Sequence, residues 1–106
     1  MEDREKKAAE RAAYAEALAA MDDDALVATT EQQCWLSAFA NNNPRAPAHW
    51  KSDLTYAEAN RREKPWLYQS GWNRAYMSCG YEPSEAERAR ATEAGYKAAE
   101  AARNAA

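Results

Sequence analysis

The side chains that could carry out covalent catalysis are few and widely separated in this sequence. Cys34 and Cys79 are the two cysteines, and His49 is the one histidine, in a chain of 106 residues. A cysteine becomes an effective nucleophile when a neighbouring base activates it, and nothing in the sequence orients such a pair. Glycine-rich phosphate loops and the Gly-x-Ser-x-Gly pattern are absent from the sequence. We therefore predict no catalytic residues and no enzymatic activity, with both cysteines reduced and mostly buried.

Three consecutive aspartates, Asp22 to Asp24, form the one cluster of carboxylates that suggests a cation site. They lack the spacing and the closing glutamate of a calcium-binding loop. A carboxylate at this position can instead accept hydrogen bonds from the free N–H groups at the start of a helix. We expect the aspartates to separate two helices, and we expect neither a metal nor a cofactor.

A basic segment interleaved with aromatic residues is the best candidate for a binding surface. Residues 34–76 contain six basic and three acidic residues, a charge of +3, although the whole chain has a net charge of −3. Basic side chains neutralise phosphates, and aromatic faces can stack on unpaired bases. The predicted partner-binding residues are Arg45, Lys51, Arg61, Arg62, Lys64, Trp66 and Arg74.

Two alternatives remain open for this segment and for the acidic start of the chain. The aromatic residues could form the core, and Glu58 and Glu63 could neutralise the basic cluster around an internal Trp66. Residues 1–33 contain nine acidic and four basic residues, a charge of −5. Such a segment could mimic nucleic acid or dock on a basic protein surface, or it could be a solvated helix.

The elements that would position these residues are helices. Alanine, glutamate, arginine and lysine favour helix, isoleucine is absent, and there are only three glycines and four prolines. We predict an all-α fold, a small bundle of four to five helices in a single domain over residues 1–106. Its predicted parts are a helical arm at 2–21, a helix at 25–40, a basic loop and short helix at 41–64, and a helix hairpin at 65–103.

Short sequence signals set the expected boundaries of these helices. Thr30 and Gln33 fit a capping box, so the second helix could begin there, unless an aspartate of 22–24 caps it earlier. Residues 41–54 read as a loop, with Ser52 or Asp53 capping a short helix near 54–63. Pro65 suits the first turn of the next helix, and Gly80 suits a left-handed residue after its end. Ser84 and Glu87 fit a capping box for a last helix at 85–103.

The apolar residues suggest how the helices pack. A narrow stripe on the first helix would dock it only weakly, through Tyr14, Leu18 and Met21. Large aliphatic residues are scarce, so we expect aromatic residues on the shared faces of three helices to meet in one core. These residues are Trp35, Phe39, Trp72, Tyr76 and Tyr96.

A motif of a small residue, an aromatic residue, two further residues and alanine occurs three times. The copies begin at Cys34, Gly71 and Gly95. In each copy the small residue would let another backbone approach closely. The motif is explained either by packing between short helices or by a repeated helix-hairpin module.

Residues 71–99 resemble the ribosome modulation factor family and its small phage and plasmid relatives. That family has two helices with a Gly-aromatic-x-x-Ala/Gly motif, joined by Cys-Pro-Tyr. Here the motifs begin at Gly71 and Gly95 and the connector is Cys79-Gly80-Tyr81, with glycine in place of proline and a shorter first spacing. Thr92 stands near the place of a tryptophan of the family. The resemblance implies a small non-enzymatic protein that binds a large ribonucleoprotein, from a phage or another mobile element.

The expected function is therefore a modulator or inhibitor of a host ribonucleoprotein machine, with an RNA contact through the basic segment. One alternative is an anti-CRISPR or other anti-defence inhibitor that binds protein through its acidic first helix. Another is a helical assembly protein that associates with itself. No apolar stretch approaches the roughly 18 residues of a membrane span, and the charged start lacks a signal's apolar region. We expect a cytoplasmic monomer or weak homodimer without a membrane partner.

Overall fold

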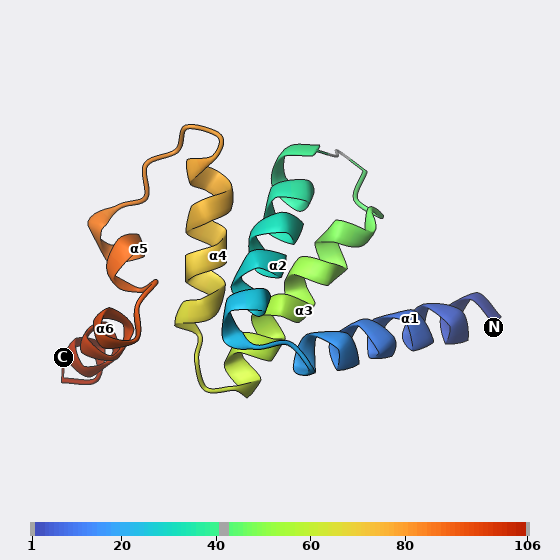
Figure 1. Cartoon of the computed structure of the whole chain (residues 1–106), viewed down its shortest axis with the longest axis horizontal. Coiled ribbons are helices and arrows are strands. Elements are labelled where there is room, and N and C mark those ends of the chain that lie inside the picture. Colours follow the sequence, from blue (N-terminus) through green and yellow to red (C-terminus); the bar gives the residue numbers. More distant parts are fainter. Residues whose placement is uncertain (1, 41–42, 106) are drawn as a thin grey trace.

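The computed structural model describes residues 2–40 and 43–105, and nearly all of them are helical (Figure 1). These residues form six α-helices and one π-helix, with no strand among them, so the predicted all-α class is confirmed. The number of helices is larger than the predicted four to five. The helices are α1 (Glu2–Ala19), α2 (Asp23–Trp35), the π-helix η1 (Leu36–Ala40), α3 (Pro47–Arg61), α4 (Trp66–Met77), α5 (Glu85–Ala89) and α6 (Glu93–Ala105).

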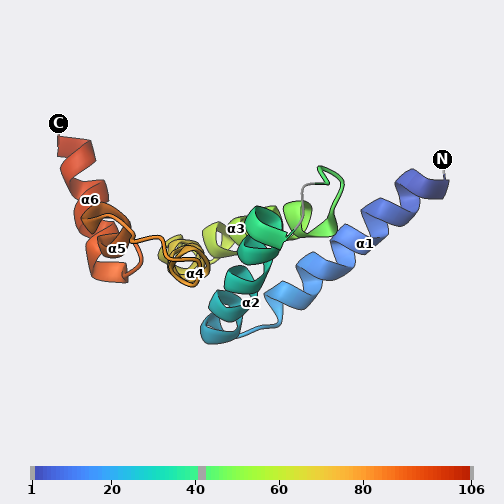
Figure 2. The same ribbon diagram turned by 90° about the horizontal axis from the view of Figure 1, so that it is seen from above.

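The helix α2 lies at the centre and packs against both α4 and α3, while α1 crosses α3 (Figure 1). Seen from above, α1 and the α5–α6 pair extend at opposite ends of the molecule (Figure 2). The principal extents of 48 × 29 × 27 Å reflect this elongated arrangement. Within the described residues, no helix is both long and apolar enough to cross a membrane.

The core consists of small and aliphatic side chains rather than the predicted aromatic ones. Three of the predicted rings do meet, since the Tyr76 ring lies 5.0 Å from that of Phe39 and 4.0 Å from that of Trp72. Trp35 and Phe39 are 40% and 43% exposed and Tyr96 contacts Trp66 instead, so the expectation that all five rings form one buried core is wrong. The reason is the close approach of the helices, which leaves room between them for leucine, valine and alanine but not for several large rings. The buried cluster comprises Leu18, Leu26, Val27, Ala59 and Leu67, with Tyr14, Met21, Leu54, Trp66 and Tyr68 packed against it.

Gly71 allows α2 and α4 to pack closely. A Cβ atom at Gly71 would lie 2.6 Å from the Thr30 side chain and 2.9 Å from the Val27 carbonyl oxygen. At Gly95 the added atom would collide with the Ala89 carbonyl group. Both glycines therefore support the packing interpretation of the recurring motif, in which the small residue permits backbone contact.

The second helix begins earlier than a cap at Thr30 would require. The Asp22 carboxylate accepts a hydrogen bond of 2.7 Å from the Ala25 N–H, so Asp22 is the N-cap of α2. The Thr30 hydroxyl donates instead to the Leu26 carbonyl, one turn earlier within the helix. The capping-box prediction at Thr30 is therefore wrong, and the alternative of an aspartate cap is confirmed.

The third helix is longer than predicted and occupies much of the expected loop at 41–54. It begins at Pro47, whose fixed φ suits the first turn of a helix. Ser52 and Asp53 are thus inside the helix, and the prediction that one of them caps it is wrong. The Ser52 hydroxyl donates to the His49 carbonyl. Residues 41 and 42 of the predicted loop lie outside the described residues.

The predicted last helix at 85–103 is divided into α5 and α6. The Thr92 hydroxyl donates to the Ala89 carbonyl and accepts a hydrogen bond from the Gly95 N–H, which ends one helix and begins the next. The capping box of Ser84 and Glu87 is confirmed. Gly80 has a φ of 89°, as predicted for a left-handed residue after α4.

Candidate functional site: a basic groove between the first and third helices

The predicted binding residues fall into two sets at opposite ends of α3. Arg45 and Lys51 lie at its beginning, and the other set, from Arg61 to Trp66, lies at its end. A helix of this length separates its ends by about 20 Å. Arg74 is exposed on α4 and belongs to neither set.

Arg62 is largely buried and connects three helices. Its side chain is 12% exposed and donates to Glu58 at 2.7 Å and to Asp23 at 2.9 Å. The same guanidinium donates to the Leu18 carbonyl at 2.8 Å and the Met21 carbonyl at 2.7 Å. Arg62 therefore donates to one carbonyl in the last turn of α1 and to one just after it, while it neutralises carboxylates of α2 and α3.

The neighbouring bases use the same two carboxylates. Arg61 donates to both oxygens of Glu58, and Lys64 pairs with Asp23 at 2.7 Å. The alternative in which carboxylates neutralise this cluster is confirmed for Glu58, but the second carboxylate is Asp23 rather than Glu63. Two carboxylates thus lie among these three predicted binding residues and pair with them.

These ion pairs shift the acidity of both carboxylates. Hydrogen bonds from Arg61 and Arg62 lower the pKa of Glu58 from 4.5 to about 2. Hydrogen bonds from Lys64 and Arg62 likewise lower the pKa of Asp23. Both groups are therefore charged at neutral pH, and the cluster acts as a network that joins α1, α2 and α3.

Trp66 is half-buried and packs against the core at the start of α4. Its ring centroid lies 6.1 Å from that of Tyr96, and the Lys97 ammonium lies over it at 5.8 Å. Trp66 thus connects α6 to the rest of the molecule. A flat surface for stacking is not presented to solvent here, because neighbouring groups cover the indole.

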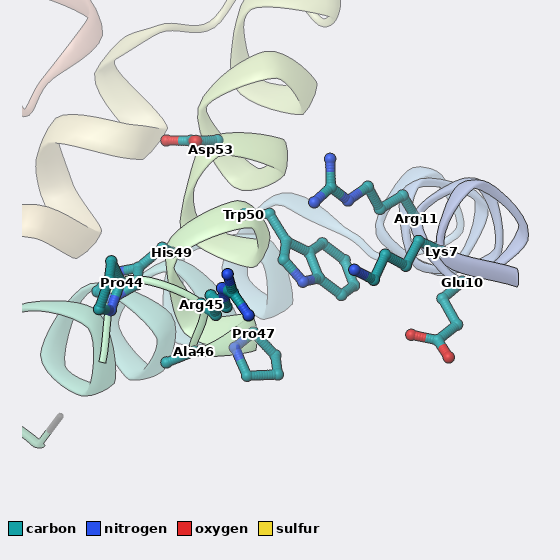
Figure 3. Close-up of a pocket in the computed structure, with 10 residues that line it drawn as sticks. All are labelled: Lys7, Glu10, Arg11, Pro44, Arg45, Ala46, Pro47, His49, Trp50 and Asp53. Atoms are coloured by element: carbon teal, nitrogen blue, oxygen red, sulfur yellow. The ribbon is translucent and has the colours of Figure 1, made fainter. Parts of the chain in front are cut away.

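A groove lies at the other end of α3, between α1 and the turn before α3 (Figure 3). Its volume is about 720 Å³. In Figure 3, Lys7 and Arg11 extend from α1 toward Trp50, whereas Glu10 is directed away from the indole. Arg45 and Pro47 lie on the side of α3. The remaining lining residues are Pro44, Ala46, His49 and Asp53.

Two cations lie over the Trp50 indole at this groove. The Arg11 guanidinium lies 5.4 Å and the Lys51 ammonium 5.7 Å from the indole, both over the ring. The Tyr14 ring meets the indole edge-on, with 5.7 Å between centroids and an angle of 87°. These contacts hold the side chains of α1 and α3 against each other.

The cations of the groove differ from Arg62 in having no carboxylate partner. Within residues 2–40 and 43–105, no ion pair involves Lys7, Arg11, Arg45 or Lys51. Glu10 and Asp53 line the groove beyond ion-pair distance of them. Their charge is therefore available to an external anion, which makes this groove the candidate functional site.

The turn that carries Arg45 is fixed by hydrogen bonds around His49. The ring Nε2 atom lies 2.9 Å from the Asn43 carbonyl oxygen, so Nε2 is the protonated donor. The other nitrogen, Nδ1, lies 2.6 Å from the Ser37 hydroxyl in η1. The Asn43 side chain also accepts from the Arg45 N–H at 3.0 Å. This network connects the π-helix to the beginning of α3.

The cysteines do not pair with His49 in this arrangement. Cys34 is buried and lies 3.7 Å from the Tyr68 hydroxyl, and burial raises the pKa of its thiol. Cys79 is exposed, so the prediction that both cysteines are mostly buried is wrong for this one. Among the residues that the structure describes, no group of three metal-ligating side chains comes together, and Asp22 and Asp23 serve as cap and ion-pair partner.

Sequence reasoning missed half of this groove. It identified Arg45 and Lys51, but it treated the first helix as an acidic arm because of its net charge. The signal was the spacing of Arg4, Lys7 and Arg11, which share one helix face. Together with Asp3 and Ala8 these residues line a second hollow that continues the groove along α1.

Comparisons with protein-family models, with curated proteins and with solved structures found no match to this chain.

Proposed function

We propose that this protein is a small non-enzymatic modulator that binds a ribonucleoprotein machine, of which the ribosome is the favoured example, in the cytoplasm. The observation that carries the proposal is the basic groove, where four cations that have no carboxylate partner among the described residues lie around Trp50. A surface of this kind suits the phosphates of an RNA-containing partner. The resemblance of residues 71–99 to the ribosome modulation factor family supports the ribosome as that partner.

The proposal moves the centre of the binding surface from one end of α3 to the other. Arg45 and Lys51 remain proposed contacts, and Lys7 and Arg11 join them. Arg62 and Lys64 are assigned to the ion-pair network, because binding a phosphate through them would require breaking contacts to Asp23 and Glu58. Further contacts from Arg61, Trp66 and Arg74 remain predictions.

Co-sedimentation with purified bacterial ribosomes tests this function. The wild-type protein should move with the ribosomal fraction at low salt, and the variant K7Q/R11Q/R45Q should remain in the supernatant. Lys6→Gln is a matched control, because Lys6 neighbours Lys7 on α1 but does not line the groove. The proposal fails if the wild-type protein does not co-sediment, or if the triple variant co-sediments as well as the control.

A specific observation favours a second candidate, the self-associating protein. Ala94, Ala98, Ala101 and Ala105 follow the alternating four-and-three spacing of a helix–helix seam, and all four are exposed on α6. Analytical ultracentrifugation over a hundredfold range of concentration distinguishes this function. A dimer that forms at micromolar concentration, and that Ala98→Glu abolishes, would support self-association.

A further inference from the structure

We infer that the groove recognises the phosphodiester backbone of a single-stranded nucleic acid without regard to base sequence, and that Trp50 positions cations instead of stacking on a base. This inference rests on the proposed function, since it specifies which part of a ribonucleoprotein the groove would contact. It follows from the surroundings of Trp50, from the charges of the lining and from the hydrogen bonds already made by His49.

The surroundings of Trp50 argue against base stacking. Arg11 and Lys51 lie over the indole, and the edge-on Tyr14 ring packs against it. Lys51 also lies 5.2 Å from the Tyr14 ring, so the two aromatic rings share this cation. A base could stack on the half-buried indole only by displacing a cation that the ring attracts. The rings therefore hold Arg11 and Lys51 in place at the groove.

The charges of the lining fit a chain of phosphates. Lys7, Arg11 and Arg45 line the groove, with Lys51 beside them on Trp50. Arg4 extends the row of cations along α1. Such a row offers several positive charges to successive phosphates of one backbone, and arginine can donate two parallel hydrogen bonds to a phosphate.

His49, which could otherwise offer a neutral donor and acceptor to a base edge, is occupied. Both ring nitrogens of His49 are engaged, one with Ser37 and the other with the Asn43 carbonyl. Glu10 and Asp53 are the lining groups that could accept a hydrogen bond from a base edge. A preference for cytosine and adenine, which carry an amino donor, over uracil, which carries none, would therefore reveal base recognition by these carboxylates.

Fluorescence anisotropy with labelled homopolymeric oligonucleotides of A, U and C, and with DNA oligonucleotides of matching sequence, tests the inference. We expect dissociation constants that agree within about threefold across sequences and sugars. Four phosphate contacts on a single strand predict that log K falls with log salt at a slope of about −3. Lys7→Gln and Arg45→Gln should each reduce the slope by about 0.7, whereas Lys6→Gln should leave it unchanged.

A variant at Trp50 separates positioning from stacking. Trp50→Phe keeps a ring for the cations and should weaken all oligonucleotides by the same factor, with its folding checked by circular dichroism. If Trp50 stacked on bases, the variant would weaken the purine oligonucleotide more than the pyrimidine ones, because purines stack more strongly. That unequal loss would overturn the positioning role of Trp50.

Three other results would overturn the inference. The first is a dissociation constant at least tenfold lower for one base or one sugar, and the second is a slope near zero for log K against log salt. The third is competition by polyglutamate as effective as that by RNA, which would indicate an acidic protein partner. Failure of the proposed function is distinguishable from these. If the oligonucleotides bind as expected but the protein does not co-sediment with ribosomes, the inference about the groove holds and the proposed function is wrong. If the protein co-sediments with ribosomes but binds oligonucleotides with sequence selectivity, the proposed function holds and the inference is wrong.

Discussion

The two ends of α3 carry similar numbers of basic residues but use them in opposite ways. At the end of the helix, Arg61, Arg62 and Lys64 surround Asp23 and Glu58, and each of the three cations has a carboxylate partner within the protein. At the beginning, the cations around Trp50 have no such partner among the described residues. The contrast teaches that a basic cluster indicates a binding surface only when the carboxylates near it in space, not in sequence, are known.

The largest effect should come from removing Arg62. Arg62→Met leaves Glu58, which is 6% exposed, without its buried partner, and it removes the side-chain donor to the Leu18 carbonyl of α1 and to the Met21 carbonyl just after this helix. Breaking a buried pair in this way costs about 3–5 kcal/mol. Urea denaturation followed by circular dichroism measures the loss. The control Arg61→Met should cost much less, because that side chain is 62% exposed and solvent screens its ion pair. If both variants lost the same free energy of unfolding, Arg62 would be no more important for the fold than the exposed Arg61.

The same network predicts a dependence of stability on acid. The pKa of Glu58 is about 2 in the folded protein and 4.5 ordinarily, so the folded state keeps this carboxylate charged where the unfolded chain takes up a proton. Stability is fully present above pH 4.5 and is lost as the pH falls toward about 2. The loss from this group should be about 2 kcal/mol. Glu58→Gln should show a smaller fall between these pH values; an identical fall would assign the acid sensitivity to other carboxylates.

A smaller effect is expected at Glu63, in the turn between α3 and α4. This residue has a φ of 58°, a left-handed conformation that is unfavourable for a side chain with a Cβ atom. Glu63→Gly should therefore raise the free energy of unfolding by about 0.5–1 kcal/mol after the entropy of the freer unfolded chain is subtracted. Thermal unfolding measures this change. A decrease in stability would show that Glu63 contributes a contact that the turn requires.

The smallest effect on stability should come from the groove. Among the described residues, the variant K7Q/R11Q/R45Q removes cations without ion-pair partners and one exposed cation–π contact, between Arg11 and Trp50. Its free energy of unfolding should change by no more than about 0.5 kcal/mol, the low end for an exposed contact of this kind. Its loss of binding to ribosomes and oligonucleotides would then be a loss of contact rather than of folding. If the groove variant destabilised the protein as much as Arg62→Met, the two ends of α3 would not differ in kind.

Local signals in the sequence predicted the helical class and several boundaries, because caps and proline effects depend on few neighbours. Ser84 with Glu87 and Gly80 are examples. The core was mispredicted because burial depends on how closely helices approach. Gly71 lets α2 and α4 lie so close together that leucine and valine side chains fill the core where aromatic rings were predicted.

The candidate site was half predictable for a related reason. Arg45 and Lys51 belong to a segment with a positive net charge, which identified it as a candidate binding surface. Lys7 and Arg11 belong to a segment with a negative net charge, so its basic residues were not predicted to bind. A helix sorts its charges onto faces, and only packing shows which face meets a neighbour. Tyr14 determines that face here, because its contact with Trp50 turns Lys7 and Arg11 toward α3.

The way α1 is attached gives it the properties of a lever. Its last turn is held by the buried Leu18 and by Arg62, while residues 3–13 lie exposed beyond Tyr14. Lys7 lies about 16 Å along the helix axis from Leu18. A rotation of about 10° around this pivot would carry Lys7 through about 3 Å, a distance comparable to a hydrogen bond. The ion-pair network at one end of α3 would stay fixed during such a rotation, and the cations of α1 at the groove would move.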